Sequence, residues 1–283
     1  MPPPAGFDAA QGTHIWVLPG LNRNNEVKMR IKSKIVSNTK IGSDLWRLKL
    51  DAGKSIKARP GQFINLLISE SYQPLLRRPF SIYDAYGKYV EIVYKVIGCG
   101  TRLLSEKKKG DVLDFMGPLG NSYLDHMTGS KSPIVLIGGG TGAASVFFLA
   151  KYLKSKKIKF TFIQGAKCRD QMVARAEFKK LGCAFATDDG SMGNKGFASD
   201  VLKDVLKDDS IIFTCGPKPM FKAIKAVADT KNFVKVFASF EEYMGCGIGA
   251  CVSCVLEIKT GDTTEYKRVC KDGTIFDLND VEF

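Results

Sequence analysis

The chain has 283 residues, a hydrophobic fraction of 45% and a formal net charge of +13 at pH 7. This length suits two compact domains with a small appendage, and no apolar stretch approaches the roughly 20 residues that span a bilayer, which excludes a transmembrane protein. Because the Lys and Arg residues are spread along the chain with acids between them and no nucleic-acid-binding motif accompanies them, we also expect no nucleic-acid partner.

The N-terminal half is predicted to begin with an irregular extension and to continue as strands. Residues 1–26 lack both a secretory signal and hydrophobic periodicity, and a cytoplasmic location is the default. Short segments with strand character then follow, separated by turn signals, at residues 27–34, 45–50, 62–68, 89–97 and 111–116. Strands of this length and spacing predict a small antiparallel β-barrel over residues 27–129.

A glycine turn marks a change to alternating strands and helices. The apolar run 133–137 leads into Gly138, Gly139, Gly140, Thr141 and Gly142 and then into an amphipathic stretch. The alternation of strands and helices continues to the strand 234–238, which is expected to be the last strand of the sheet. This alternation predicts a parallel-sheet α/β domain over residues 130–239. A glycine turn between a strand and a helix lets backbone N–H groups approach a dinucleotide.

A second segment is expected to face the same crevice. Cys215, Gly216 and Pro217 stand at the end of a later predicted strand, and the carboxyl ends of parallel strands converge on one edge of a sheet. Together with the glycine turn, they predict a nucleotide site.

Four cysteines near the C-terminus have a defined spacing. Cys246, Cys251, Cys254 and Cys270 follow the pattern C-x4-C-x2-C-x15-C, which is the plant-type spacing of a 2Fe–2S cluster. They lie in residues 240–283, where a hairpin of strands 255–258 and 266–269 is too small to fold without a staple. Structural zinc and free thiols are the alternatives, but zinc sites usually pair one C-x2–4-C motif with another.

Glycines surround the first three of these cysteines. We expect Gly245, Gly247 and Gly249 to take positive φ, so that the backbone comes close to the cluster and its N–H groups point at sulfur.

A third group of motifs indicates a flavin. Arg78, Pro79, Phe80 and Ser81 follow a predicted barrel strand, and a glycine turn at residues 98–101 stands at a predicted helix N-terminus, which suits a pyrophosphate. In this order, and with the cysteine cluster, the motifs resemble the ferredoxin–NADP reductase superfamily and, within it, the iron–sulfur electron-transfer subunits of class 1B dihydroorotate dehydrogenase.

The resemblance implies an assignment of cofactor residues. Nine residues are implied to contact FAD: Arg78, Pro79, Phe80, Ser81, Val93, Tyr94, Lys95, Gly100 and Thr101. Eight are implied to contact NAD: Gly138, Gly139, Gly140, Thr141, Gly142, Cys215, Gly216 and Pro217. The residues after the strand 160–164 allow either NAD or NADP, because Lys167 and Arg169 suit a 2′-phosphate whereas Asp170 suits a ribose hydroxyl.

The sequence lacks a motif for acid–base catalysis, so the chemistry is expected to belong to the cofactors. The resemblance implies an oxidoreductase subunit of pyrimidine biosynthesis that takes electrons from an FMN-containing dihydroorotate dehydrogenase catalytic subunit, in a heterotetramer of two of each chain. Two alternatives stay open: a similar subunit of a hydrogenase, sulfide dehydrogenase or ferredoxin-linked NAD(P)H oxidoreductase, or a zinc-stapled nucleotide-binding module that is not an enzyme.

Overall fold

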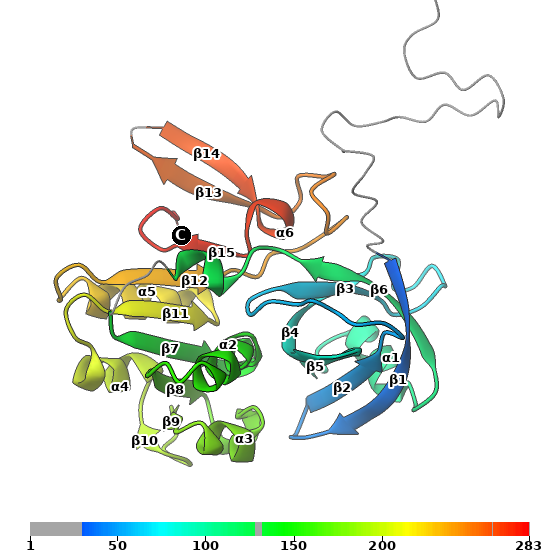
Figure 1. The fold of residues 1–283 in the computed structure, drawn as a ribbon, viewed down its shortest axis with the longest axis horizontal. Coiled ribbons are helices and arrows are strands. Elements are labelled where there is room, and N and C mark those ends of the chain that lie inside the picture. Colours follow the sequence, from blue (N-terminus) through cyan, green and yellow to red (C-terminus); the bar gives the residue numbers. More distant parts are fainter. Residues whose placement is uncertain (1–29, 128–131, 262, 283) are drawn as a thin grey trace, which may run out of the picture.

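The computed structural model describes residues 30–127, 132–261 and 263–282, so the extension predicted over residues 1–26 lies outside the described residues. A barrel and a helix-covered sheet lie side by side, and a hairpin of the C-terminal segment lies above the sheet in the view of Figure 1. This order along the chain agrees with the predicted fold class.

Six antiparallel strands form the closed barrel in the order β1-β2-β5-β4-β3-β6. Side chains at the start of β1 alternate between solvent and the interior, as the period-two pattern of the sequence predicts. Leu48, Ile64 and Phe115 fill the interior and Leu104 of α1 closes it, all four without solvent exposure. The elements are β1 (Arg30–Lys40), β2 (Leu45–Asp51), β3 (Phe63–Leu67), β4 (Arg78–Tyr86), β5 (Tyr89–Lys95), α1 (Cys99–Glu106) and β6 (Val112–Leu119).

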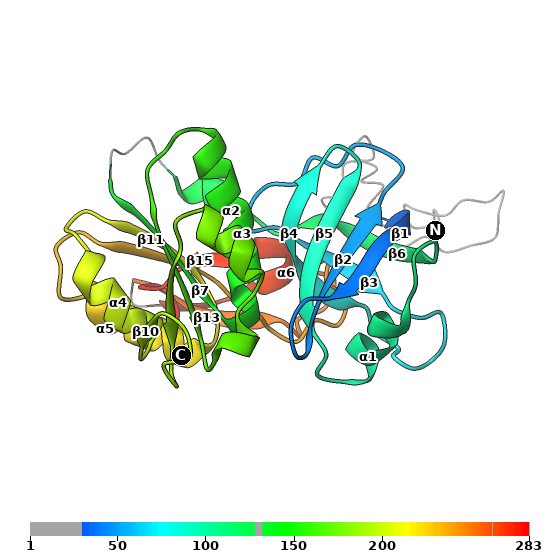
Figure 2. The ribbon, with the colours of Figure 1, turned by 90° about the horizontal axis from the view of Figure 1, so that it is seen from below.

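The second part is a sheet of seven strands in the order β10-β9-β8-β7-β11-β12-β15, with helices on both faces. Its centre is fully buried, so its strands read as continuous apolar runs such as that of β7. One face packs on α2 and α3 and the other on α4 and α5 (Figure 2). The elements are β7 (Ile134–Gly139), α2 (Ala143–Ser155), β8 (Thr161–Ala166), α3 (Arg175–Lys180), β9 (Ala184–Thr187), β10 (Asn194–Lys195), α4 (Ala198–Val205), β11 (Ile211–Cys215), α5 (Lys218–Ala228) and β12 (Lys235–Ser239). Short 3-10 turns lie at Tyr123–His126, Gly140–Gly142 and Arg169–Gln171.

The C-terminal segment returns to the large sheet. It consists of β13 (Val255–Thr260), β14 (Thr263–Arg268), α6 (Val269–Asp272) and β15 (Ile275–Asp277). Because β15 pairs antiparallel with β12, the expectation that 234–238 closes the sheet is wrong by one strand. Three residues give too short a pattern to reveal a strand. The side chain of Asn121 holds the start of β15 in place, since it accepts hydrogen bonds from the N–H groups of Thr274 and Ile275, each at 2.9 Å.

Barrel and sheet are joined by a packed seam between β4 and α2. The ring of Tyr83 stacks on that of Phe147 with centroids 4.2 Å apart. Arg47 of β2 forms an ion pair with Glu177 of α3 at 2.5 Å, and Lys151 of α2 pairs with Asp84 of β4. These contacts fix the position of the barrel relative to the sheet, and hence the shape of any site between them.

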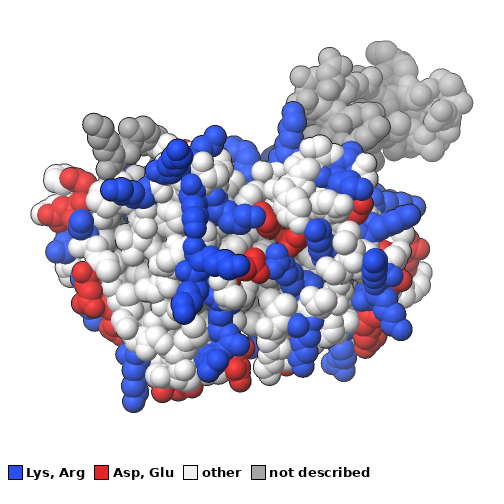
Figure 3. Space-filling view, turned by 60° about the horizontal axis from the view of Figure 1, so that its bottom comes forward, with Lys and Arg blue, Asp and Glu red and all other residues white. Residues whose placement is uncertain are grey.

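The surface of the molecule carries mixed charge. Figure 3 shows Lys and Arg side chains on both the barrel and the sheet, with acids among them. Within the described part of the chain, no helix is long and apolar enough to cross a membrane.

Candidate functional site

The four clustered cysteines come together as two pairs. In the first pair, the N–H of Cys251 donates to Sγ of Cys246 at 3.3 Å, and the N–H of Cys246 lies 3.5 Å from Sγ of Cys251. In the second pair, Cys254 and Cys270 are both buried, and the neighbouring Cys254 thiol contributes to the raised pKa of Cys270. Among the described residues, no group of three or more His, Cys, Asp or Glu side chains is arranged around one metal ion. Two pairs fit two irons, with two thiolates on each.

Residues 245–254, which we call the cluster loop, aim backbone N–H groups at these sulfurs. Sγ of Cys246 also accepts from the N–H of Ala250 at 3.2 Å, and Sγ of Cys270 accepts from that of Gly249 at 3.1 Å. Such bonds stabilise thiolates and tune a bound cluster. The backbone of the loop thus fits an iron–sulfur cluster, as its spacing predicts.

The glycines of the cluster loop have two different roles. Gly247 and Gly249 have φ of +73° and +80°, as expected. A Cβ on Gly247 would also lie 2.1 Å from Nδ2 of Asn65 in β3. The expectation of positive φ is wrong for Gly245, where a Cβ would make close contacts of 3.2 Å with Oγ of Ser253 and 3.3 Å with Sγ of Cys251.

The thiols differ in their ionisation. The hydrogen bond from the Ser253 hydroxyl lowers the pKa of Cys251 to about 6, whereas burial raises the pKa of Cys270 to about 12. Thiolates are the form that ligates iron, so Cys251 is ready for a metal at neutral pH. Arg268 ties the hairpin to the loop, because its Nη1 donates to the carbonyl of Gly249 at 2.9 Å.

The predicted flavin residues meet at one end of the barrel. Arg78 begins β4, and its Nε would lie 3.3 Å from a Cβ on Gly100 in the first turn of α1. The Thr101 hydroxyl accepts from the N–H groups of Ile97 and Gly98 at 3.0 and 3.2 Å and so fixes this turn. The first N–H groups of a helix have no partner within it, so this turn and Arg78 together suit a phosphate.

Other predicted flavin residues are placed differently by the structure. The Tyr94 side chain is buried, stands edge-on to Phe80 at 5.9 Å, and donates to Oδ1 of Asn38 at 3.0 Å. It therefore faces the barrel interior, where it packs in the core. Val93 is also buried, whereas Pro79 and Ser81 are half-buried. Lys95, at the end of β5, points into a cavity at the sheet.

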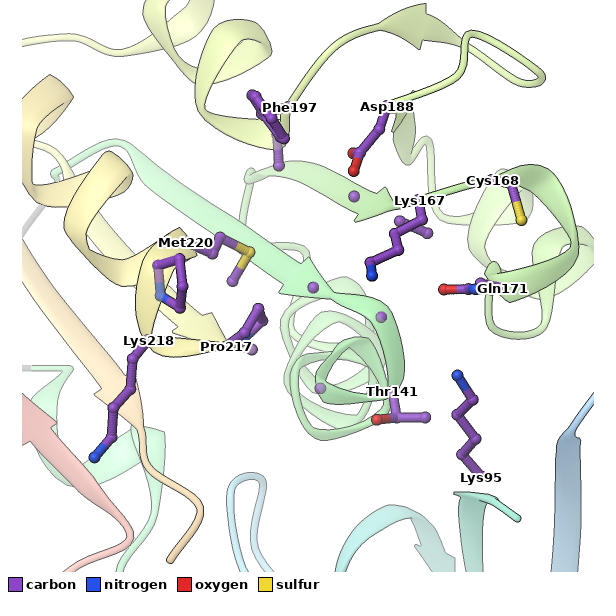
Figure 4. Close-up of a pocket in the computed structure, with 18 of the residues that line it drawn as sticks. Lys95, Thr141, Lys167, Cys168, Gln171, Asp188, Phe197, Pro217, Lys218 and Met220 are labelled. Atoms are coloured by element: carbon purple, nitrogen blue, oxygen red, sulfur yellow. The ribbon is translucent and has the colours of Figure 1, made fainter. Parts of the chain in front are cut away.

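This cavity, of about 810 Å³, lies between the carboxyl edge of the sheet and the barrel (Figure 4). We call it the nucleotide cavity. Six of the eight predicted NAD residues line it: Gly139, Gly140, Thr141, Gly142, Gly216 and Pro217. Gly138 and Cys215 lie beneath it instead. A Cβ on Gly138 would lie 2.4 Å from Cα of Ala143, and Cys215 has no exposed surface.

Several residues that line the cavity were not among the eight predicted to contact NAD, although their positions in the sequence could have identified them. Each follows the carboxyl end of a parallel strand by one to five residues, where ligands of such sheets bind. They are Gln171, Asp188, Lys218, Met220 and Glu241, together with Lys167, which the sequence analysis had considered only for a 2′-phosphate. In Figure 4, Lys95, Lys167 and Gln171 point into the cavity from one side, and Pro217 and Met220 from the other. Arg169 does not line the cavity.

The fold is shared by known flavin-dependent reductases. A ferredoxin–NADP+ reductase from Neisseria gonorrhoeae matches 75% of this chain and 99% of its own at a TM-score of 0.65 and 14% identity, a likeness of fold alone. The structure of an NADH-dependent reduced ferredoxin–NADP oxidoreductase matches 88% of this chain and 89% of its own, with a TM-score of 0.74 and 30% identity. The fold and the cysteine cluster define an oxidoreductase of the ferredoxin–NADP reductase type with an added iron–sulfur domain.

Closer comparisons identify the family. Residues 241–282 match the iron-sulfur cluster binding domain of dihydroorotate dehydrogenase B. The NAD(+)-dependent dihydroorotate dehydrogenase B electron transfer subunit of Fusobacterium nucleatum is 36% identical over 88% of this chain and 96% of its own. That of Caldanaerobacter subterraneus is 35% identical over 91% of this chain and 100% of its own. The chain belongs to this family of electron transfer subunits.

These matches confirm the predicted family, the predicted fold class and an oxidoreductase that uses an iron–sulfur cluster, FAD and NAD. The individual cofactor residues and the domain boundaries stay predictions.

Proposed function

We propose that this chain carries electrons from a dihydroorotate dehydrogenase catalytic subunit, through a 2Fe–2S cluster and FAD, to NAD+. Its curated relatives are named as the electron transfer subunits of the NAD(+)-dependent enzyme. The observation that carries the proposal is the placement of the cysteine pairs beside the flavin-type barrel, with the nucleotide cavity between that barrel and the sheet.

The cluster loop and the segment after α6 both contact the barrel side of the molecule. Nδ2 of Asn65 in β3 donates to the carbonyl of Cys246 at 3.4 Å, and the hydroxyl of Thr274 donates to the carbonyl of Gly61 at 3.1 Å. On the other side, Lys95 of the barrel lines the nucleotide cavity. A flavin held by the barrel would therefore lie between cluster and nucleotide, and short gaps favour electron transfer.

Each part of the chain would have a separate task. We propose that residues 27–129 hold FAD, with Arg78 and the start of α1 on its phosphates; that 130–239 hold NAD on the glycine turn after β7; and that 240–283 hold the cluster. A bound flavin exchanges two electrons as hydride with the nucleotide and single electrons with the cluster. The protein excludes water and fixes the distances.

We propose that the partner contains FMN, assembles with this chain as two copies of each, and covers the cluster loop. Tyr243 and Val252 have 94% and 74% of their surface exposed, and Ile248 is exposed between them. Large apolar side chains gathered on one exposed segment indicate a protein interface. The eight cysteines, all free in the structure, support a reducing compartment, for which we propose the cytoplasm.

The test separates this chain from its partner. Purified alone with its cofactors, the chain should oxidise NADH with an artificial dye but should not oxidise dihydroorotate. Addition of an FMN-containing dihydroorotate dehydrogenase subunit should restore reduction of NAD+ by dihydroorotate. The cluster-deficient variant Cys251→Ser should keep the dye reaction and lose the coupled one. Dihydroorotate oxidation by the isolated chain would overturn the proposal.

A second candidate rests on the structural likeness to the NADH-dependent reduced ferredoxin–NADP oxidoreductase at 30% identity. In that case, the chain would couple to a ferredoxin-linked flavoprotein instead of a dihydroorotate dehydrogenase. Reduction of the cluster by such a partner, together with no coupling to any FMN subunit, would favour this candidate.

A further inference from the structure

The Ser253 hydroxyl lies against one of the four clustered sulfurs. Its Oγ is 3.3 Å from Sγ of Cys251. The same oxygen accepts a hydrogen bond from the N–H of Gly245 at 2.9 Å. A cysteine that ligates iron is a thiolate and has no proton to donate. With iron bound, Ser253 is therefore the donor in this contact, and its proton points at the sulfur of Cys251.

This donor differs from the others around the cluster loop. The hydrogen bonds to the sulfurs of Cys246 and Cys270 come from backbone N–H groups, which remain when a side chain is changed. The bond from Ser253 comes from a side chain, and Ser253 is exposed. Its acceptor Cys251 is partly exposed, whereas Cys254 and Cys270 are buried. The Ser253 hydroxyl therefore acts on the sulfurs nearest the surface of the molecule.

A hydrogen bond to a cluster sulfur affects the reduced state more than the oxidised state. Reduction adds one electron to the cluster, and the added negative charge is shared by its sulfur ligands. A donor proton that points at sulfur stabilises this charge and so raises the reduction potential. Because water competes for an exposed hydroxyl, we expect the effect of one ordinary hydrogen bond and no more.

We propose that the Ser253 hydroxyl raises the reduction potential of the cluster by donating a hydrogen bond to the Cys251 sulfur. The inference rests on the proposed placement of a 2Fe–2S cluster on the four cysteines. Ser253 touches an iron ligand and not the iron itself, so it is a positioning residue. Its hydroxyl adjusts how readily the cluster accepts an electron from the catalytic subunit and passes it to FAD.

The test compares variants that differ in this hydroxyl. Ser253→Ala removes it, and Ser253→Thr and Ser253→Val have nearly the same shape, although the threonine alone keeps the hydroxyl. Redox titration of the chain loaded with FAD and cluster, followed by the electron paramagnetic resonance signal of the reduced cluster, gives the midpoint potential. Ser253→Ala and Ser253→Val should make reduction about three- to tenfold less favourable, which lowers the potential by about 30–60 mV at 59 mV per tenfold change. Ser253→Thr should keep the wild-type potential.

Iron and sulfide analysis separates this role from a structural one, since each variant should keep the cluster content of the wild type. Thr264→Ala removes an exposed hydroxyl from the hairpin of the same domain and is the control, with no change in potential expected. An unchanged potential in Ser253→Ala and Ser253→Val, or an equal fall in Ser253→Thr, overturns the role of Ser253. Loss of the cluster from the variants without the hydroxyl also overturns it, while the proposed function stands. A wild-type chain that binds no iron overturns the proposed function itself.

Discussion

The cluster loop and the nucleotide cavity are both binding regions, but they are built in different ways. The loop takes three of its four thiols from nine consecutive residues, and its backbone N–H groups point at those sulfurs. The cavity takes its lining from five strand ends and from the barrel. A site formed by one short segment is fixed by local conformation, whereas a site assembled from distant segments depends on the packing of the whole fold.

The largest effect is expected from the loss of any one of the four cysteine ligands. Cys246→Ser, Cys251→Ser, Cys254→Ser or Cys270→Ser should each lose most of the iron and sulfide, because the cluster needs all four thiolates. FAD content should stay near that of the wild type, since the barrel has its own core. Iron and sulfide analysis together with the visible spectrum measures both. Cys168→Ser, in a cysteine outside the loop, is the control; full cluster content in any one ligand variant would remove that cysteine from the set.

The next prediction concerns the barrel. Arg78→Ala removes a charged donor that lies beside the first turn of α1. A hydrogen bond to a charged group contributes about 1.5–3 kcal/mol, so FAD affinity should fall roughly 10- to 100-fold. Retention of FAD through dilution and gel filtration measures this, and iron content should not change. Unchanged FAD retention would mean that the phosphates lie elsewhere.

Two glycines of the turn after β7 test how tightly the nucleotide cavity is packed. Gly142 has an ordinary helical φ, yet a Cβ there would lie 2.6 Å from the carbonyl oxygen of Cys215. Gly140 has φ of +53° and open space around it. Gly142→Ala should therefore lower the free energy of unfolding by about 1–3 kcal/mol, since backbone must move, and Gly140→Ala by about 1 kcal/mol, from strain alone. Urea denaturation compares them, and a larger loss for Gly140→Ala would contradict the packing argument.

The same contrast explains what could be read from the sequence. Period-two patterns predicted the barrel, because a strand buried on one face alternates apolar and polar residues. Continuous apolar runs predicted the parallel sheet, because its strands are buried on both faces. The strand β15 has only three residues, which are too few to form either pattern. The cysteine spacing pointed to all four thiols, whereas Glu241 and Met220 carry no motif and enter the cavity only because adjacent strands end there. Cys215 was predicted as lining and lies below the surface, since a strand's last residue can point to either face.

Lys95 gives the smallest effect and the sharpest test of the two binding regions. Its motif implied FAD, but its side chain points into the nucleotide cavity beside Lys167 (Figure 4). Lys95→Ala should weaken NAD+ binding about three- to tenfold, as expected for one partly exposed charge, and the effect should shrink with added salt. FAD content should stay constant, the reverse of Arg78→Ala. Loss of FAD with unchanged NAD+ affinity would return Lys95 to the flavin site. Titration of both variants with NAD+ at two salt concentrations decides between these outcomes. If Lys95 of the barrel contacts the nucleotide, NAD+ binding depends on the position of the barrel relative to the sheet.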